Sequence, residues 1–131
     1  MSAEAIDWLQ EPRVLIVEDE PLIAMNLAEQ VSALGVSVQI AARVDEGWRL
    51  FHSWHPHLVV LDVQLPDGDG VALAGRMLAL GPLPLIFVTA NNEDRETRSR
   101  IATLAHAQVY SKGVSPRVLQ AAIVLGLGDL G

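Results

Sequence analysis

Short apolar runs alternate along this chain with segments whose apolar residues recur at helical spacing. The apolar runs have the length of strands, and the segments between them are long enough for helices. Strands that alternate with helices favour right-handed crossovers and a parallel sheet covered by helices on both faces. We therefore predict an α/β fold, a doubly wound five-stranded parallel sheet. The predicted strands are 13–17, 36–40, 58–61, 83–88 and 108–110, and the predicted helices are 21–34, 44–53, 71–80, 93–105 and 116–125.

The length of 131 residues suits one domain with a substantial core. The segment before the first strand is unusually apolar, because it contains Ile6, Trp8 and Leu9. We expect these side chains to pack against the bottom or flank of the domain, and a contact with a partner or a second copy is the alternative. The predicted divisions are an N-terminal leader over 1–12, a domain over 13–125, and a C-terminal tail over 126–131 that frays.

Composition excludes several classes of protein. Half of the residues are hydrophobic, which argues against a disordered chain, and the formal net charge is −7. An acidic chain lacks the basic surface that nucleic acids require, so we expect no nucleic-acid contact. The absence of cysteine excludes disulfides and thiolate metal sites. No run approaches the roughly 20 apolar residues of a membrane span, and residues 1–10 do not resemble a secretory signal. We therefore expect a cytoplasmic protein without membrane insertion.

Polar residues follow four of the predicted strands. Because parallel strands end at the same edge of a sheet, these side chains should converge there. Carboxylates held together repel one another unless a cation intervenes, and Mg²⁺ prefers oxygen ligands of this kind, with Mn²⁺ as a substitute. A lysine and a hydroxyl beside them complete a site for a transferable phosphoryl group, with Asp62 as the carboxylate nucleophile. The converging residues are Glu18, Asp19, Asp62, Thr89 and Lys112.

Four segments together resemble the signature motifs of the response-regulator receiver domain. They are Val-Glu-Asp-Glu at 17–20, Leu-Asp-Val-Gln-Leu-Pro-Asp-Gly-Asp-Gly at 61–70, Val-Thr-Ala at 88–90 and Ser-Lys at 111–112. Each motif alone is weak, but all four in this order at the ends of the expected strands are specific. The resemblance covers 13–125 and implies the flavodoxin-like strand order 2-1-3-4-5. It also implies a stand-alone receiver domain without a DNA-binding output domain.

The resemblance assigns the phosphoryl chemistry to Asp62. This residue would accept a phosphoryl group from the phosphohistidine of a histidine kinase or from a phosphotransfer protein. Asp19, Asp62 and the backbone carbonyl of Gln64 would bind Mg²⁺ directly, and Glu18 would act through water. The domain would not be an enzyme, apart from Mg²⁺-dependent self-phosphorylation and slow hydrolysis of its own aspartyl phosphate.

The remaining family positions concern the bound phosphoryl group. Lys112 would pair with the phosphate or with Asp62, and Thr89, followed by Ala90, would move to hydrogen-bond it. Gln64 and Asn91 would tune the lifetime of the phosphate. The helix at 93–105, the strand at 108–110 and the helix at 116–125 would form the surface that contacts a downstream protein. We expect a monomer or a weak dimer.

Two positions depart from the usual receiver pattern. Gly113 follows the lysine where the family usually has proline, and Val109 stands where the family has a switch aromatic. Tyr110 is one position later, and one step along a strand reverses the face, so this side chain should not act as the usual rotating aromatic.

Two other functions are consistent with these residues. Gly113 and Val109 favour a receiver-like binding module that works without phosphorylation. A phosphatase of the haloacid-dehalogenase type also uses an aspartate at a strand end, but it requires a second aspartate at the place of Gln64. We expect Glu20 to act as a helix-terminal acid and nothing more. The segment 66–70 should form a turn in which an aspartate caps the next helix.

Overall fold

The computed structural model describes residues 11–128 and confirms the predicted α/β fold. Within these residues, five strands form one parallel sheet in the order β2-β1-β3-β6-β7, which is 2-1-3-4-5 when these strands are counted along the chain. All of β3, at the centre, is buried, which explains its uninterrupted apolar sequence. The strands are β1 (Arg13–Val17), β2 (Ser37–Ala41), β3 (Leu58–Leu61), β6 (Leu85–Thr89) and β7 (Ala107–Ser111).

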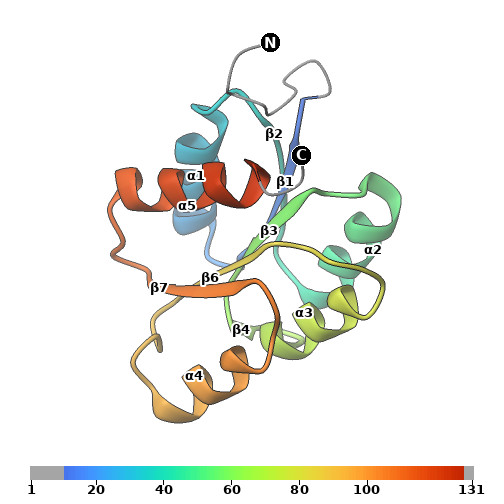
Figure 1. Ribbon diagram of the computed structural model, residues 1–131, viewed down its shortest axis with the longest axis vertical. Coiled ribbons are helices and arrows are strands. Elements are labelled where there is room, and N and C mark those ends of the chain that lie inside the picture. Colours follow the sequence, from blue (N-terminus) through green and yellow to red (C-terminus); the bar gives the residue numbers. More distant parts are fainter. Residues whose placement is uncertain (1–10, 129–131) are drawn as a thin grey trace.

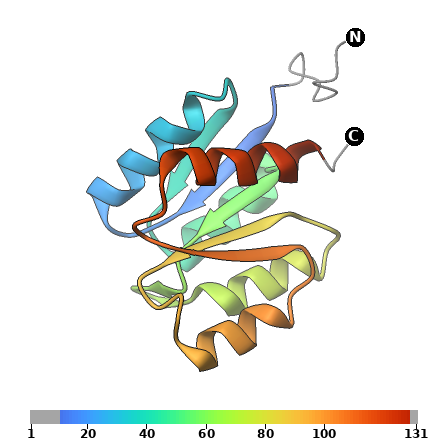
Figure 2. The ribbon, with the colours of Figure 1, turned by 60° about the vertical axis from the view of Figure 1, so that its left-hand side comes forward.

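Within residues 11–128, five helices cover the two faces of the sheet (Figures 1 and 2). Side chains of α1 and α5 complete the core on one face, and those of α2, α3 and α4 complete it on the other. In this part of the chain, no helix combines the length and the apolar character needed to cross a membrane. The helices are α1 (Pro21–Ser32), α2 (Val44–Trp54), α3 (Gly70–Leu78), α4 (Arg95–Ala102) and α5 (Pro116–Gly128).

A small antiparallel hairpin lies between β3 and α3. The sequence predicts a turn over 66–70, and the structure adds the strands β4 (Gln64–Leu65) and β5 (Gly68–Asp69) around it. Strands of two residues carry no periodic pattern, so the sequence does not reveal them. The predicted cap is confirmed, because Asp69 Oδ1 accepts a hydrogen bond from the Val71 N–H at 2.8 Å. The hairpin is thereby joined to the start of α3.

Helix α5 continues to Gly128, beyond the predicted end at Leu125. Residues 126–128 therefore belong to the helix and not to the predicted fraying tail. A Cβ added to Gly126 would lie 2.8 Å from Leu58 Cδ1, so this glycine lets the helix approach the start of β3 closely. Leu127 is buried in the core beside α1 and α5, which holds the last turn in place. The apolar leader residues lie outside the described residues.

Gly70, the first residue of α3, is the position at which this fold tolerates a side chain least. Its N–H donates a hydrogen bond to the Val63 carbonyl at 2.7 Å, and an added Cβ would overlap the carbonyl oxygen of Asp62. The substitution Gly70→Ala should therefore lower the free energy of unfolding by about 1–3 kcal/mol or more. Urea denaturation measures this change.

Gly75→Ala in the same helix is the matched control. An added Cβ at Gly75 would meet Leu104 Cδ2 at 4.0 Å, an ordinary contact. Since alanine is the better helix former, this variant should be as stable as the parent, or more stable by up to about 1 kcal/mol. Equal stability of the Gly70 and Gly75 variants would contradict the steric argument.

Candidate functional site

The predicted polar residues meet at the carboxyl edge of the sheet, because the strands that carry them are adjacent and parallel. Glu18 and Asp19 follow β1, Asp62 follows β3, Thr89 ends β6, and Lys112 follows β7. The structure brings most of them to one surface hollow, together with several residues from the loops after β3 and β6. Residues that line this hollow include Asp19, Glu20, Asp62, Gln64, Thr89, Ala90, Asn91 and Lys112.

Three carboxylates form a cluster in this edge. Glu18, Asp19 and Asp62 each contribute one oxygen atom, and these oxygens lie within 4.8 Å of one another. Glu18 and Asp62 are buried, and Asp19 is the more accessible member. A group of hard oxygen donors with one open side fits a Mg²⁺ ion that also keeps water molecules or a phosphate oxygen as ligands. The residues present therefore fit the metal that the motifs imply.

Asp62 is held by a different partner at each of its two oxygens. The residue is 5% exposed, Oδ1 accepts a hydrogen bond from the Val63 N–H at 2.7 Å, and Oδ2 lies 2.9 Å from Lys112 Nζ. Its own backbone N–H donates to the Val17 carbonyl at 3.1 Å, which ties the residue to β1. The carboxylate is thus fixed in direction at the end of the central strand, beside the hollow.

Lys112 contacts carboxylates from the ends of two other strands. Its Nζ lies 2.9 Å from Asp62 Oδ2, 3.5 Å from Glu18 Oε1 and 2.5 Å from Glu20 Oε2. Partial burial disfavours the charged form of the lysine, but the hydrogen bonds to Glu20 and Asp62 and the charges of Asp62 and Glu18 outweigh it and raise the pKa of Lys112. The ammonium group therefore stays charged and neutralises part of the acidic cluster.

Glu18 is the deepest acid of the cluster, with 2% of its surface exposed. Burial raises the pKa of its carboxyl group, and the nearby charge of Asp62 acts in the same direction, whereas the Glu20 N–H and Lys112 lower it. Oε2 accepts a hydrogen bond from the Glu20 N–H at 3.1 Å. Oε1 has no hydrogen-bond partner within the described chain, and its ion-pair contact with Lys112 Nζ is long, at 3.5 Å, so this buried oxygen can take an additional ligand.

Glu20 is a member of the site that the sequence interpretation missed. The prediction treated it as a helix-terminal acid, but its Oε2 lies 2.5 Å from Lys112 Nζ, and its side chain makes no capping hydrogen bond to α1. The prediction that Glu20 does nothing more than this was wrong, because Glu20 also pairs with Lys112. The lysine that turns Glu20 into an ion-pair partner lies 92 residues away, and no local signal marks the pairing.

Thr89 lies on the other side of the hollow, at the end of β6. It is 1% exposed, and its Oγ1 accepts a hydrogen bond from the Asn91 N–H at 3.2 Å, which fixes the turn after the strand. Ala90 and Asn91 line the same hollow. Gln64 lines it from the opposite hairpin, where β4 pairs it with Asp69. The predicted phosphate-binding and lifetime-tuning positions are therefore all within one hollow.

The side chains of Val109 and Tyr110 pack on opposite faces of the sheet. Val109 contacts the core beneath α2, α3 and α4, and Tyr110 contacts the core beneath α1 and α5. β7 pairs with β6 in continuous register, without a bulge, from Ala107 to Ser111. The structure confirms that Tyr110 does not occupy the side of the sheet at which Val109 replaces the family aromatic.

A hydrogen-bonded turn follows Lys112. The Val114 N–H donates to the Ser111 carbonyl at 3.0 Å, and the Gly113 N–H donates to Ser111 Oγ at 3.3 Å. Gly113 therefore takes part in a closed turn between β7 and α5. This turn places Lys112 at the edge of the sheet without the proline that the family usually has.

Comparisons with known proteins agree with this geometry. The family model described as the response regulator receiver domain matches residues 14–124. The chain is 35% identical over 112 residues to the transcriptional regulatory protein AfsQ1 of Streptomyces coelicolor, covering 86% of this chain and 49% of that protein. It is 31% identical over 115 residues to the probable transcriptional regulator ycf27 of Porphyridium aerugineum, covering 88% and 48%. The chain thus spans about half the length of these curated relatives.

Solved structures with similar sequences share the fold. A CheY-like response regulator receiver domain from Methanospirillum hungatei superposes with a TM-score of 0.84 and 29% identity, covering 91% of this chain and 95% of that one. The non-phosphorylated HemR receiver domain from Leptospira biflexa gives a TM-score of 0.80 and 29% identity, covering 89% and 94%. With the sheet order, the acidic cluster and the family match in agreement, the chain belongs to the response regulator receiver domain family of two-component systems.

Proposed function

We propose that Asp62 is the phosphoacceptor of this receiver domain. The observation that carries the proposal is the position of its carboxylate, which is buried at the end of the central strand, adjoins two further acids and contacts Lys112 Nζ at 2.9 Å. A carboxylate nucleophile needs a fixed direction and a neighbouring positive charge that stabilises the transferring phosphoryl group. Asp62 has both.

The acidic cluster is the proposed Mg²⁺ site. Asp19 and Asp62 would bind the ion directly with the backbone carbonyl of Gln64, and Glu18 would hold it through a water molecule. When bound, the ion neutralises the carboxylates and the phosphoryl oxygens, so that attack by one anion on another becomes feasible. The buried Oε1 of Glu18, which lacks a hydrogen-bond partner and has only the 3.5 Å ion-pair contact with Lys112, supports a ligand at this place.

The transfer step uses the protein groups around Asp62. A carboxylate oxygen of Asp62 forms a bond to phosphorus while the bond from phosphorus to the kinase histidine nitrogen breaks, and that nitrogen leaves with the electron pair. Lys112 offers its ammonium group to the new phosphoryl oxygens. Thr89, Ala90, Gln64 and Asn91 line the same hollow. The Thr89 hydroxyl would hydrogen-bond the phosphoryl group, and Gln64 and Asn91 would tune how readily water reaches the aspartyl phosphate.

Phosphorylation would then alter the surface near α4. The modification adds nearly two negative charges and three strong acceptor oxygens beside Lys112 and Thr89. Lys112 would exchange part of its contact with Glu20 for the phosphoryl group, and Thr89 would draw the turn before α4 toward the site. The surface formed by α4, β7 and α5 would present this change to a downstream protein. The partner proteins would be a histidine kinase or phosphotransfer protein and that downstream protein.

A binding module that functions without phosphorylation is the second candidate. It is favoured by Val109, which leaves no aromatic side chain on that face of β7 to follow a movement of Thr89. The phosphatase alternative has weaker support, because Gln64 occupies the place of its second aspartate.

Labelling from a phosphorylated histidine kinase distinguishes these functions. With Mg²⁺ present, the parent protein should take up one acid-stable, base-labile equivalent of phosphate per chain, and Asp62→Asn should take up none, because the nucleophilic oxygen is lost. Glu93→Gln, which alters an exposed acid in the loop before α4, is the control and should label like the parent. Equal labelling of Asp62→Asn and the parent would contradict the assignment of the nucleophile.

Removal of a proposed metal ligand should weaken Mg²⁺ binding. Asp19→Asn should reduce Mg²⁺ affinity by roughly ten-fold or more, as measured by titration of amide chemical shifts, because a charged oxygen ligand is lost. Glu20→Gln removes an acid at the adjacent position that contacts Lys112 and lies outside the proposed ligand set. This variant should bind Mg²⁺ with nearly the parent affinity. A larger loss of Mg²⁺ affinity in Glu20→Gln than in Asp19→Asn would contradict the proposed ligand set.

A further inference from the structure

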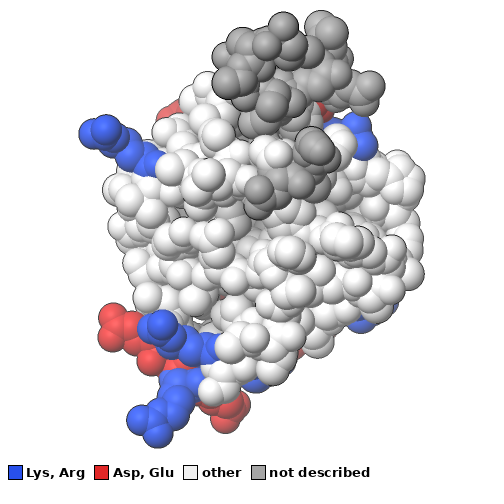
Figure 3. Space-filling view, viewed as in Figure 1, with Lys and Arg blue, Asp and Glu red and all other residues white. Residues whose placement is uncertain are grey.

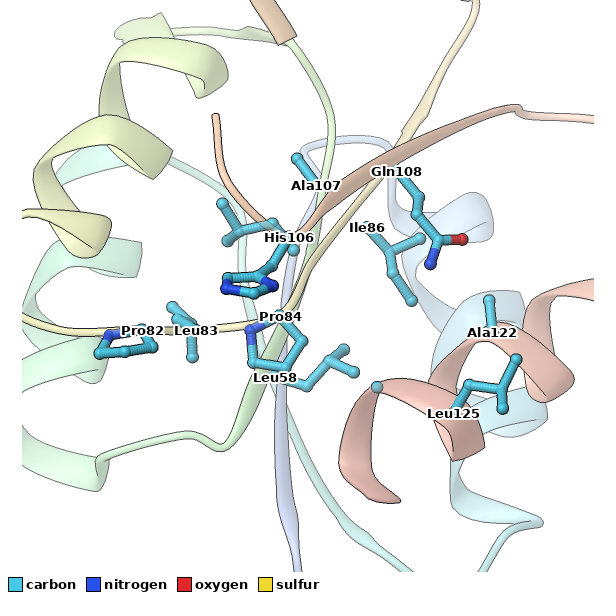
Figure 4. A pocket seen from close by; sticks show the side chains of 12 residues that line it. Leu58, Pro82, Leu83, Pro84, Ile86, His106, Ala107, Gln108, Ala122 and Leu125 are labelled. Atoms are coloured by element: carbon cyan, nitrogen blue, oxygen red, sulfur yellow. The ribbon is translucent and has the colours of Figure 1, made fainter. Parts of the chain in front are cut away.

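A cavity of about 480 Å³ opens at the amino edge of the sheet, at the opposite ends of the strands from the acidic site. It lies between the starts of β3, β6 and β7 and the last turns of α5. Pro84 and His106 lie toward one side of it, Ala122 and Leu125 lie toward the other, and Leu58 lies between them (Figure 4). Its volume is in the range of pockets that enclose a small molecule or a few side chains.

Most of the residues that line the cavity have apolar side chains, although polar atoms, among them those of Gln108 and His106, also form part of its wall. Among the described residues that line it, His106 is the one ionisable side chain. The adjoining surface of α5 is also apolar, because Val124 is 38% exposed and Leu125 is 68% exposed. Figure 3 shows a broad face without charged side chains across α5 and the neighbouring strands, and charges gather at the end occupied by α4. An apolar partner suits this place better than a charged one.

The chain enters the sheet at the same edge. The parallel register places Val14 of β1 beside Leu58 of β3, and one residue later β3 pairs with the start of β6. Neighbouring strands are about 4.8 Å apart, so the start of β6 lies roughly 10 Å from the start of β1. Arg13 is fixed there, because its N–H donates to His57 Nδ1 at 2.9 Å and its guanidinium donates to the His55 carbonyl at 2.8 Å.

The backbone turns immediately before this point. Glu11 has a φ of 43°, in the left-handed region, although it is not glycine and precedes Pro12. Both features disfavour this conformation, since a residue before proline prefers an extended backbone. Such a conformation persists where neighbouring contacts hold it.

The leader supplies apolar side chains at a suitable distance. Ile6, Trp8 and Leu9, which lie outside the described residues, precede the turn. The four residues from Trp8 to Pro12 can span at most about 13 Å, and less with Glu11 in a left-handed conformation, so their reach is comparable to the roughly 10 Å between the starts of β1 and β6. A tether this short holds Trp8 at a millimolar effective concentration near the cavity.

We propose that the leader of this chain docks in the amino-edge cavity, with Trp8 and Leu9 against Leu125, Pro84 and Leu58. The contact covers the exposed apolar end of α5 and stabilises the turn at Glu11. It leaves the acidic site free, because that site lies at the other ends of the strands. The proposal is independent of the phosphoryl chemistry, so a failure of one leaves the other intact.

Fluorine NMR of the full chain labelled with 5-fluorotryptophan tests this contact. The chain has 3 tryptophans, and the spectrum of Trp8→Phe identifies the Trp8 resonance. In the parent, this resonance should lie away from its position in urea-unfolded protein. Leu125→Glu should move it to the unfolded position, because the carboxylate removes an apolar contact, is costly to bury against the indole and repels the acidic leader. The Trp48 and Trp54 resonances report whether the domain is still folded.

Val118→Glu is the matched control, because Val118 is 47% exposed on the same helix and does not line the cavity. It should leave the Trp8 resonance unchanged. A Trp8 resonance at the unfolded position in the parent would overturn the proposal, as would equal effects of the two α5 variants. A resonance that moves to the unfolded position on dilution, with a dimer in sedimentation, would overturn it in favour of docking by a second copy.

Discussion

The contact between Lys112 and the carboxylates at the carboxyl edge is the interaction on which the rest of the site depends. Its ammonium group lies 2.9 Å from Asp62 Oδ2 and 2.5 Å from Glu20 Oε2, and Glu18 is close behind. Like charges about 4 Å apart repel by roughly 4 kcal/mol at the effective dielectric near a protein surface. The acids follow β1 and β3, and the lysine follows β7, so the strand order itself brings this cation to its partners. A phosphoryl group on Asp62 would enter this balance directly and compete with Glu20 for the lysine.

No aromatic side chain lies on the face of β7 that carries Val109. Val109 faces the core under α4, and Tyr110 packs on the other side of the sheet. A polar contact joins α4 to the β4–β5 hairpin, because Arg100 forms an ion pair with Asp69. Asp69 also caps α3 and pairs with Gln64 across the β4–β5 hairpin. The helix and the loop that follows Asp62 are therefore linked through backbone pairing and one ion pair.

The sequence predicts the parts of this structure that depend on local pattern. β3 was predictable to the residue, because a strand buried on both faces is a continuous apolar run. The edge at which the acids and Lys112 meet follows from parallel topology. The Glu20–Lys112 ion pair could not be predicted in this way, because the two residues are 92 positions apart and no local pattern indicates that their side chains point toward each other. The end of α5 could not be predicted from the sequence either. Gly126 resembles the glycine that ends a helix, but in the structure it allows the helix to pack closely on Leu58.

The most direct test of this account is the response of backbone amide resonances to beryllofluoride with Mg²⁺, a mimic of the phosphoryl group. A phosphoacceptor at Asp62 predicts large shifts at Asp62, Thr89 and Lys112, followed by shifts along α4. These shifts should be absent when Mg²⁺ is left out. A spectrum that stays unchanged around Asp62 and Thr89 at saturating beryllofluoride and Mg²⁺ would contradict the central claim and favour a domain that functions without phosphorylation.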